Sequence, residues 1–219
     1  LKAGFDRGDF TKEIYERSLA NSYRNLAVWT TDPDIHRLSP GLRKANLKAI
    51  REGRWEDIIE AYRGEVPFGT AGIRGFATLS QEELLLLKEY GPSAAILKGP
   101  NTINDVTLMK KTQAVIDMMK KNGQTRVQIG YDSRVAGQQF AEMIARQFIA
   151  ASTPEHMFTI YLFDEASPFP ELSFGVTTEE AKSDWGLFIS ASHNPRRYNG
   201  FKITRGNGAQ LNQKAKEEV

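Results

Sequence analysis

The second half of the chain alternates between strand-like and helix-like segments, and this alternation constrains the fold more than any other feature. Residues 126–131 (RVQIGY) alternate polar and apolar side chains and predict a strand. Apolar runs at 156–164 and 185–190 predict two further strands, and residues 200–204 a short fourth one. Helices are predicted at residues 106–121, 136–152 and about 171–182. Strands that alternate with helices are typical of a layered α/β sheet, which binds ligands at the carboxyl ends of its strands.

The first sixty residues have a different, helical character. Apolar side chains between Phe10 and Trp29 recur at helical spacing, and residues 39–53 and 54–64 predict two shorter helices. Each of these two ends at a glycine, Gly53 or Gly64, which we expect to adopt the left-handed cap conformation. We therefore expect a helical N-terminal segment over residues 1–64, packed on an α/β domain over residues 65–219.

Composition excludes several classes of protein. The net charge is only +2, from 29 basic and 27 acidic residues, which argues against a partner held by bulk charge such as nucleic acid or a membrane surface. The chain contains no cysteine, so disulfides, thiol catalysis and cysteine-based zinc sites are excluded. No apolar run approaches the roughly 18 residues of a membrane span. We expect a cytoplasmic location.

Two polar segments flank the predicted strands where a ligand would bind. In VQIGYDSR, Asp132 and Arg134 follow a strand, where Arg134 could reach an anion, but for this pair taken alone a turn cap with a surface arginine is the favoured explanation. In FGTAGIRG, three glycines allow close approach of the backbone to a ligand, and Arg74 offers a guanidinium suited to phosphate or carboxylate. This segment lacks the spacing of a P-loop, and the same glycines would also suit an ordinary loop.

The segment SASHNP contains a Ser-His step at the end of a predicted strand. Ser192 and His193 would point in opposite directions in extended backbone, and the G-x-S-x-G elbow of hydrolases is absent, so a serine hydrolase is disfavoured. The basic and amide side chains that follow would suit a serine that carries a phosphoryl group. They are Asn194, Arg196, Arg197 and Lys202. From spacing alone, a plain turn with a structural histidine is favoured slightly over this phosphoserine interpretation.

Four motifs taken together resemble the N-terminal domain of the α-D-phosphohexomutase superfamily. They are FGTAGIRG, GYDSR, SASHNP and YNGFK, which occur in the order and at the separations typical of that superfamily. The resemblance spans residues 66–211 and is strongest for the phosphoglucomutase/phosphomannomutase group, which includes phosphopentomutases. It implies a three-layer α/β/α domain with a mixed, mostly parallel sheet, and further domains on the C-terminal side that this chain does not contain.

The resemblance also implies a reaction and a set of site residues. The full-length protein would be an intramolecular phosphotransferase that moves phosphate between positions of a hexose phosphate through a phosphoserine and a sugar 1,6-bisphosphate, which also serves as activator. The implied catalytic residues are Ser192, His193, Lys202 and Arg74, and the implied phosphate- or substrate-binding residues are Asn194, Arg134, Gly69 and Thr70. This chain alone is expected to be inactive. The alternatives are a phosphopentomutase, a phosphoglucosamine mutase or a non-catalytic phosphate-binding relative.

The resemblance further implies Mg²⁺, bound by the phosphate of Ser192 and by the carboxylates of a D-x-D-x-D loop. This chain contains no such loop, and its nearest approach is Asp32 and Asp34 in the helical segment. The remaining metal ligands are therefore expected from the missing domains. Ser190 stands where phosphoglucomutases often carry threonine, so the identity of the sugar stays open.

Overall fold

A six-stranded mixed sheet forms the centre of the computed structural model, which describes residues 5–9, 11–69 and 72–211. The strands are β1 (Phe68–Gly69), β2 (Gly72–Phe76), β3 (Arg126–Tyr131), β4 (Thr159–Leu162), β5 (Trp185–Ile189) and β6 (Tyr198–Arg205). Their order is β1-β2-β6-β5-β3-β4. β3 runs parallel to β4 and β5, whereas the other three pairings are antiparallel. The mixed sheet is confirmed, but the expectation that it is mostly parallel is wrong, because β6 returns directly beside β5 without a crossover helix.

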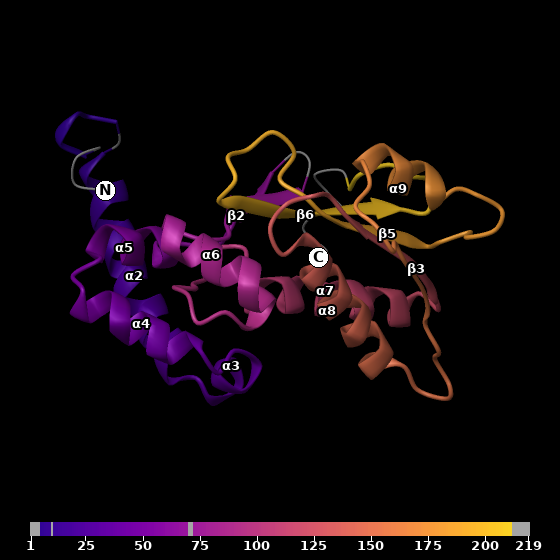
Figure 1. The fold of residues 1–219 in the computed structure, drawn as a ribbon, viewed down its shortest axis with the longest axis horizontal. Coiled ribbons are helices and arrows are strands. Elements are labelled where there is room, and N and C mark those ends of the chain that lie inside the picture. Colours follow the sequence, from indigo (N-terminus) through magenta and orange to yellow (C-terminus); the bar gives the residue numbers. More distant parts are fainter. Residues whose placement is uncertain (1–4, 10, 70–71, 212–219) are drawn as a thin grey trace.

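Helices cover both faces of this sheet, which gives the predicted three layers (Figure 1). α7 (Asp105–Lys121) and α8 (Gly137–Ala151) lie on one face, and α9 (Phe169–Gly175) lies on the other. The core between the sheet and α7 and α8 contains fully buried Val115, Ile129 and Phe140. A smaller cluster of Leu172, Val176 and Phe188 lies under α9. Among the described residues, no helix is long and apolar enough to cross a membrane.

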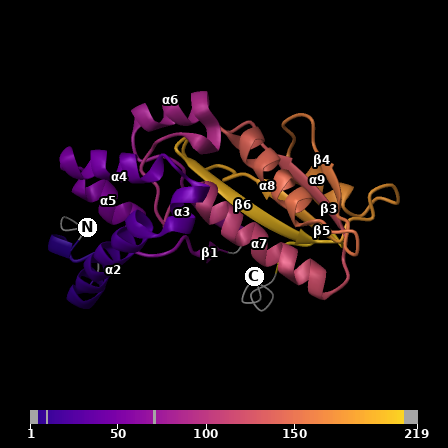
Figure 2. The ribbon, with the colours of Figure 1, turned by 90° about the horizontal axis from the view of Figure 1, so that it is seen from below.

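The N-terminal helices gather at one end of the molecule, opposite to β3 and β4 and beside β1 and α6 (Figure 2). They are α2 (Lys12–Thr31), α3 (Pro33–Leu38), α4 (Leu42–Arg51) and α5 (Trp55–Tyr62), and α6 (Gln81–Tyr90) packs next to them. Trp29 and Tyr62 share a buried cluster with Leu97 and Val106. The helical segment therefore packs on the α/β part through a common core. The boundary at residue 65 stays a prediction.

Three local predictions differ from the structure. α6 was not expected, because its four consecutive leucines hide the helical period, although Ser80 caps it by accepting a hydrogen bond from the Glu83 amide. α9 ends at Gly175 rather than near residue 182. Gly53 has the expected φ of +65°, but Gly64 does not adopt a left-handed conformation, so the expected cap at the end of α5 is wrong.

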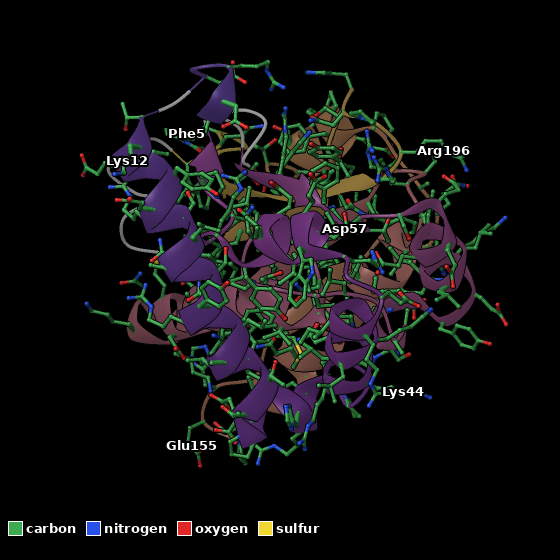
Figure 3. The ribbon with its side chains drawn as sticks, turned by 90° about the vertical axis from the view of Figure 1, so that its left-hand side faces the viewer. Phe5, Lys12, Lys44, Asp57, Glu155 and Arg196 are labelled. Carbon is green, nitrogen blue, oxygen red and sulfur yellow. The ribbon has the colours of Figure 1, made fainter. Side chains whose placement is uncertain are left out.

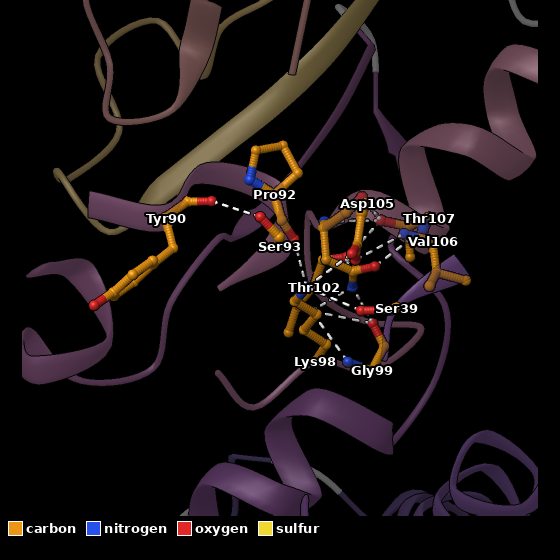
Figure 4. Close-up of polar contacts among 11 residues, drawn as sticks. Ser39, Tyr90, Pro92, Ser93, Lys98, Gly99, Thr102, Asp105, Val106 and Thr107 are labelled. Carbon is orange, nitrogen blue, oxygen red and sulfur yellow. Dashed lines mark hydrogen bonds and ion pairs between the residues drawn. The ribbon is translucent and has the colours of Figure 1, made fainter. Parts of the chain in front are cut away.

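A buried polar cluster around the ion pair of Lys98 and Asp105 joins the N-terminal helices to the domain through Ser39 (Figure 4). The Lys98 ammonium donates to Asp105 Oδ2 at 2.8 Å and to Ser39 Oγ at 3.0 Å, and it also bonds to the Pro92 carbonyl. Burial lowers the pKa of Lys98, while the carboxylate of Asp105 opposes this shift. Ser39 lies between α3 and α4, whereas Asp105 begins α7, so this cluster links segments that are far apart in the sequence.

Candidate functional site

The loop between β5 and β6 presents Ser192 at the surface. Ser192 has a φ of +54°, a left-handed conformation that is uncommon for serine and turns the chain sharply after β5. Its amide donates to the Ser190 hydroxyl at 2.9 Å, and the Ser190 amide donates to the Gly200 carbonyl on β6. The Ser192 side chain is exposed, so the serine is not packed in the core. His193 is exposed as well, and no hydrogen bond joins the two side chains within the described structure.

Arg74 reaches the Ser192 hydroxyl from the neighbouring strand. It lies on β2 directly opposite Gly200 of β6, where the missing side chain leaves room for the arginine stem. Its Nη2 lies 3.3 Å from Ser192 Oγ, although the two residues are 118 positions apart. Arg74 Nε is buried without a hydrogen-bond partner among the described residues. The guanidinium therefore contacts the serine through Nη2, while its Nε–H has no acceptor among the described residues.

Lys202 lies on β6 opposite Phe188 and is only 5% exposed. Its ammonium lies over the ring of Phe169, with Nζ 4.4 Å from the ring centroid. Burial lowers the pKa of Lys202, and the positive charge of Arg74 lowers it further, while the carboxylate of Asp132 opposes the shift. A lysine with a lowered pKa is better suited to accept a proton near neutral pH than an exposed one.

The lowered pKa of Lys202 predicts that the side chain costs stability when it is charged. The cost is fully present below the folded-state pKa and disappears as pH rises toward the unfolded-state value, because the neutral amine is easily buried. Lys202→Met should therefore raise the free energy of unfolding at pH 7, with a smaller gain at pH 10. Urea denaturation at the two pH values measures this difference. A gain that grows with pH would contradict the sign of the shift.

Arg134 holds the loop in shape. Its Nη1 donates to the carbonyls of Pro195 and Tyr198, each at 3.0 Å, and its Nη2 donates to the carbonyls of Ser192 at 2.7 Å and Asn194 at 2.6 Å. Its Nε lies 3.6 Å from Asp132 Oδ2. All four terminal N–H groups are therefore used within the protein, which gives Arg134 a positioning role in this structure, while its binding of phosphate stays a prediction.

Replacing Arg134 with methionine should leave four loop carbonyls without their donor. We expect the free energy of unfolding to fall by about 2 kcal/mol, since the carbonyls are partly hydrated and recover bonds to water. Chemical denaturation measures the loss. Arg146→Met provides a control, because that arginine is exposed and pairs with Glu142 on α8. Equal stability of the two variants would show that the loop does not need Arg134.

The remaining predicted site residues are placed as follows. Asn194 is half-buried, and its backbone N–H donates to the Ala191 carbonyl at 3.1 Å. It lines an open hollow together with Ser192. Gly69 ends β1 and pairs with Gly72 of β2. Thr70 lies outside the described residues. The hollow beside Ser192 is lined by Asp132, Ser133, Arg134, Val135, Ser192, Asn194 and Arg196.

Two residues shape this site through contacts that the sequence does not predict. Ser190 caps the turn at Ser192 through its hydroxyl, and Arg197 binds the Leu79 carbonyl beyond β2. No local sequence signal distinguishes either from an ordinary loop residue. Pairing of β2 with β6 brings Arg197 to the turn after β2, whereas Ser190 directly follows β5, two residues before Ser192.

The described residues do not form a magnesium site by themselves. They contain no group of three or more histidine, aspartate or glutamate side chains that could hold a metal ion. Asp132 is the carboxylate that lines the hollow beside Ser192. One carboxylate does not meet the octahedral oxygen coordination of Mg²⁺. That further ligands come from outside this chain stays a prediction.

Residues 65–219 match the model of the phosphoglucomutase/phosphomannomutase family, alpha/beta/alpha domain I. The chain belongs to this family. A phosphoglucomutase of Staphylococcus aureus (strain USA300) is 33% identical over 161 residues, which cover 72% of this chain and 24% of the relative. A human phosphopentomutase is 29% identical over 178 residues, covering 77% of this chain and 25% of the relative. The chain thus spans about a quarter of the length of these mutases.

Two solved structures share the fold of this family member. A Thermus thermophilus protein assigned as a phosphomannomutase is similar with a TM-score of 0.52 at 23% identity, over 71% of this chain and 29% of the other. The parafusin of Paramecium, a phosphoglucomutase in its open form, gives a TM-score of 0.50 at 18% identity, over 73% of this chain and 25% of the other. At these identities the likeness concerns the fold alone.

Proposed function

We propose that this chain is the first domain of a phosphosugar mutase in which Ser192 carries the transferable phosphoryl group. One observation supports this most directly: an exposed serine on a left-handed turn has the Arg74 guanidinium 3.3 Å from its hydroxyl. A cation at this position stabilises a phosphoserine and the charge that develops when its phosphoryl group is transferred. Family membership supports the same assignment.

In the proposed reaction, phosphoserine 192 gives its phosphoryl group to a hydroxyl of a sugar monophosphate. The bond between Ser192 Oγ and phosphorus breaks as a bond between the sugar oxygen and phosphorus forms. The neutral amine of Lys202 accepts the proton of the sugar hydroxyl and passes a proton on to the released Ser192 Oγ, so the serine hydroxyl forms again. Arg74 neutralises the transferred group, and His193 and Asn194 contribute further donors at the loop. The sugar bisphosphate then returns its other phosphate: the bond between that phosphorus and its sugar oxygen breaks and a bond to Ser192 Oγ forms. The serine proton passes through Lys202 to the sugar oxygen that is released.

Several parts of this proposal depend on the full-length protein. Mg²⁺ bound through the Ser192 phosphate would complete its coordination with carboxylates from the domains that this chain lacks. We expect the chain alone to be inactive, because the sugar would be bound mainly by those domains. A sugar 1,6-bisphosphate would restore the phosphoserine when it is lost. The cytoplasmic location stays a prediction.

The mass of the full-length protein tests the proposal. After incubation with glucose 1,6-bisphosphate and Mg²⁺, we expect about one phosphate, located on the peptide that contains Ser192. A protein that takes up no phosphate would instead be a non-catalytic relative that keeps the fold. Phosphate on another residue would also contradict the assignment.

A pentose phosphate is a second candidate substrate, because a phosphopentomutase is among the relatives that cover three quarters of this chain. The two candidates share the Ser192 chemistry and differ only in the sugar. Comparing kcat/KM of the full-length protein for glucose 1-phosphate and ribose 1-phosphate separates them. We expect the hexose phosphate to be preferred, and a higher value for the pentose would replace this assignment.

A further inference from the structure

The Ser192 loop is anchored at its far end to the turn that follows β2. The Arg197 carbonyl accepts hydrogen bonds from the amides of Ala77 at 2.7 Å and Thr78 at 3.2 Å, and the Arg197 guanidinium binds the Leu79 carbonyl. That guanidinium also lies over the Phe76 ring, 5.5 Å from its centroid. The conformation of the loop therefore depends on where residues 76–79 lie.

A buried carboxylate fixes this turn in place. Glu83 of α6 is 5% exposed, and its Oε2 accepts a hydrogen bond from the Leu79 amide at 3.0 Å. Its Oε1 accepts one from the Leu97 amide at 3.1 Å. Leu97 precedes Lys98, whose buried ion pair with Asp105 holds that segment (Figure 4). A buried carboxylate is stable only when its charge is compensated.

The compensating charge comes from the helical N-terminal segment. Arg54, the residue before α5, places Nη1 2.9 Å from Glu83 Oε1 and Nε 2.8 Å from Asp57 Oδ2. Figure 3 looks onto this end of the molecule, with Asp57 near the middle of the view and Arg196 of the Ser192 loop toward its edge. A continuous set of polar contacts thus runs from Arg54 through Glu83 and Leu79 to Arg197.

We propose that the helical N-terminal segment positions the Ser192 loop, with Arg54 as a positioning residue that acts through Glu83 and the 76–79 turn. Without the Arg54 cation, Glu83 would be left as a buried charge with two backbone donors, and the turn that it holds would loosen. Arg197 would transmit this loosening to the loop. The phosphoryl-transfer role of the loop rests on the proposed function. The effect of Arg54 on the conformation of the loop does not.

Amide hydrogen exchange in the full-length protein tests the link. Arg54→Met should speed exchange at Ala77, Leu79 and Tyr198 by about tenfold, with the amides of β3 unchanged. Arg63→Met is the matched control, because Arg63 directly follows the same helix and its guanidinium pairs with Glu60. Exchange at residues 192–198 that stays at the wild-type rate, or that rises equally in the control, would overturn the proposal.

A second variant keeps the test decisive if Arg54→Met unfolds the whole protein. Arg54→Lys keeps a cation beside Glu83, whose two oxygens both accept from backbone amides, so loop exchange should stay within about threefold of wild type. An Arg54→Lys protein with wild-type exchange in β3 but tenfold faster exchange in the loop would overturn the proposal. Exchange reports on the link, whereas phosphate on Ser192 reports on the proposed function, so failure of one is distinguishable from failure of the other.

Discussion

Replacing Ser192 with alanine should abolish turnover of glucose 1-phosphate by the full-length protein, with kcat falling by at least about a thousandfold. The reason is covalent: without Oγ there is no atom to hold the phosphoryl group while the sugar changes orientation. Arg74 and Lys202 would remain but would have no group to transfer. A coupled assay for glucose 6-phosphate, with bisphosphate and Mg²⁺ present, measures this loss.

A control variant shows whether the loss is specific to this serine. Ser93→Ala removes a hydroxyl that donates to the Tyr90 carbonyl at an exposed position far from the loop in the sequence, and it should keep wild-type turnover. Because Ser192 is exposed, its removal should also leave thermal stability nearly unchanged. Turnover that survives Ser192→Ala would rule out the phosphoserine mechanism.

Replacing Gly72 with alanine should destabilise the protein by about 4 kcal/mol, as the sum of backbone strain and overpacking. Gly72 begins β2 with a φ of +98°, which L side chains rarely adopt. An added Cβ would lie 2.3 Å from the Phe201 carbonyl oxygen and 2.9 Å from Lys202 Cα, both backbone atoms of β6 that cannot move without breaking the ladder. Guanidinium denaturation measures the loss.

Gly123→Ala separates strain from steric overlap in this experiment. Gly123 also has a positive φ, +66°, but an added Cβ there would meet nothing within 4 Å. Its replacement should cost only about 1 kcal/mol. Equal losses in the two variants would mean that the close approach of β2 to β6 is not what requires glycine at position 72.

The parts of the fold that depend on local pattern could be predicted from the sequence. β3 occupies the predicted residues 126–131, and α7 begins one residue before its predicted start and ends where predicted. α6 was missed, since its leucine run obscures the period. The strand directions in the sheet could not be predicted from local patterns. The antiparallel return of β6 depends on a loop that turns sharply at Ser192, a position that carries neither glycine nor proline.

The resemblance predicts that Arg74 and Ser192 belong to one site, but the contacts of Arg134 could not be predicted from the sequence. Ser192, Arg74 and Lys202 were identified through motifs spread over more than a hundred residues, and the structure brings Arg74 to Ser192. Arg134 was expected to bind phosphate because an arginine after a strand can serve either an anion or the backbone. Its role depends on where four carbonyl groups of another loop lie. That information is tertiary and leaves no trace near residue 134.

The hairpin of β5 and β6 carries Ser192 and Lys202 on one continuous piece of chain, and Arg74 is joined to it through the β2–β6 ladder. Strand pairing therefore holds the backbones of Arg74 and Lys202 in a fixed register, and the loop that carries Ser192 is the part of this group that can shift. Under the proposed function, a change of position between the two half-reactions would then fall to the sugar or to this loop rather than to the strands.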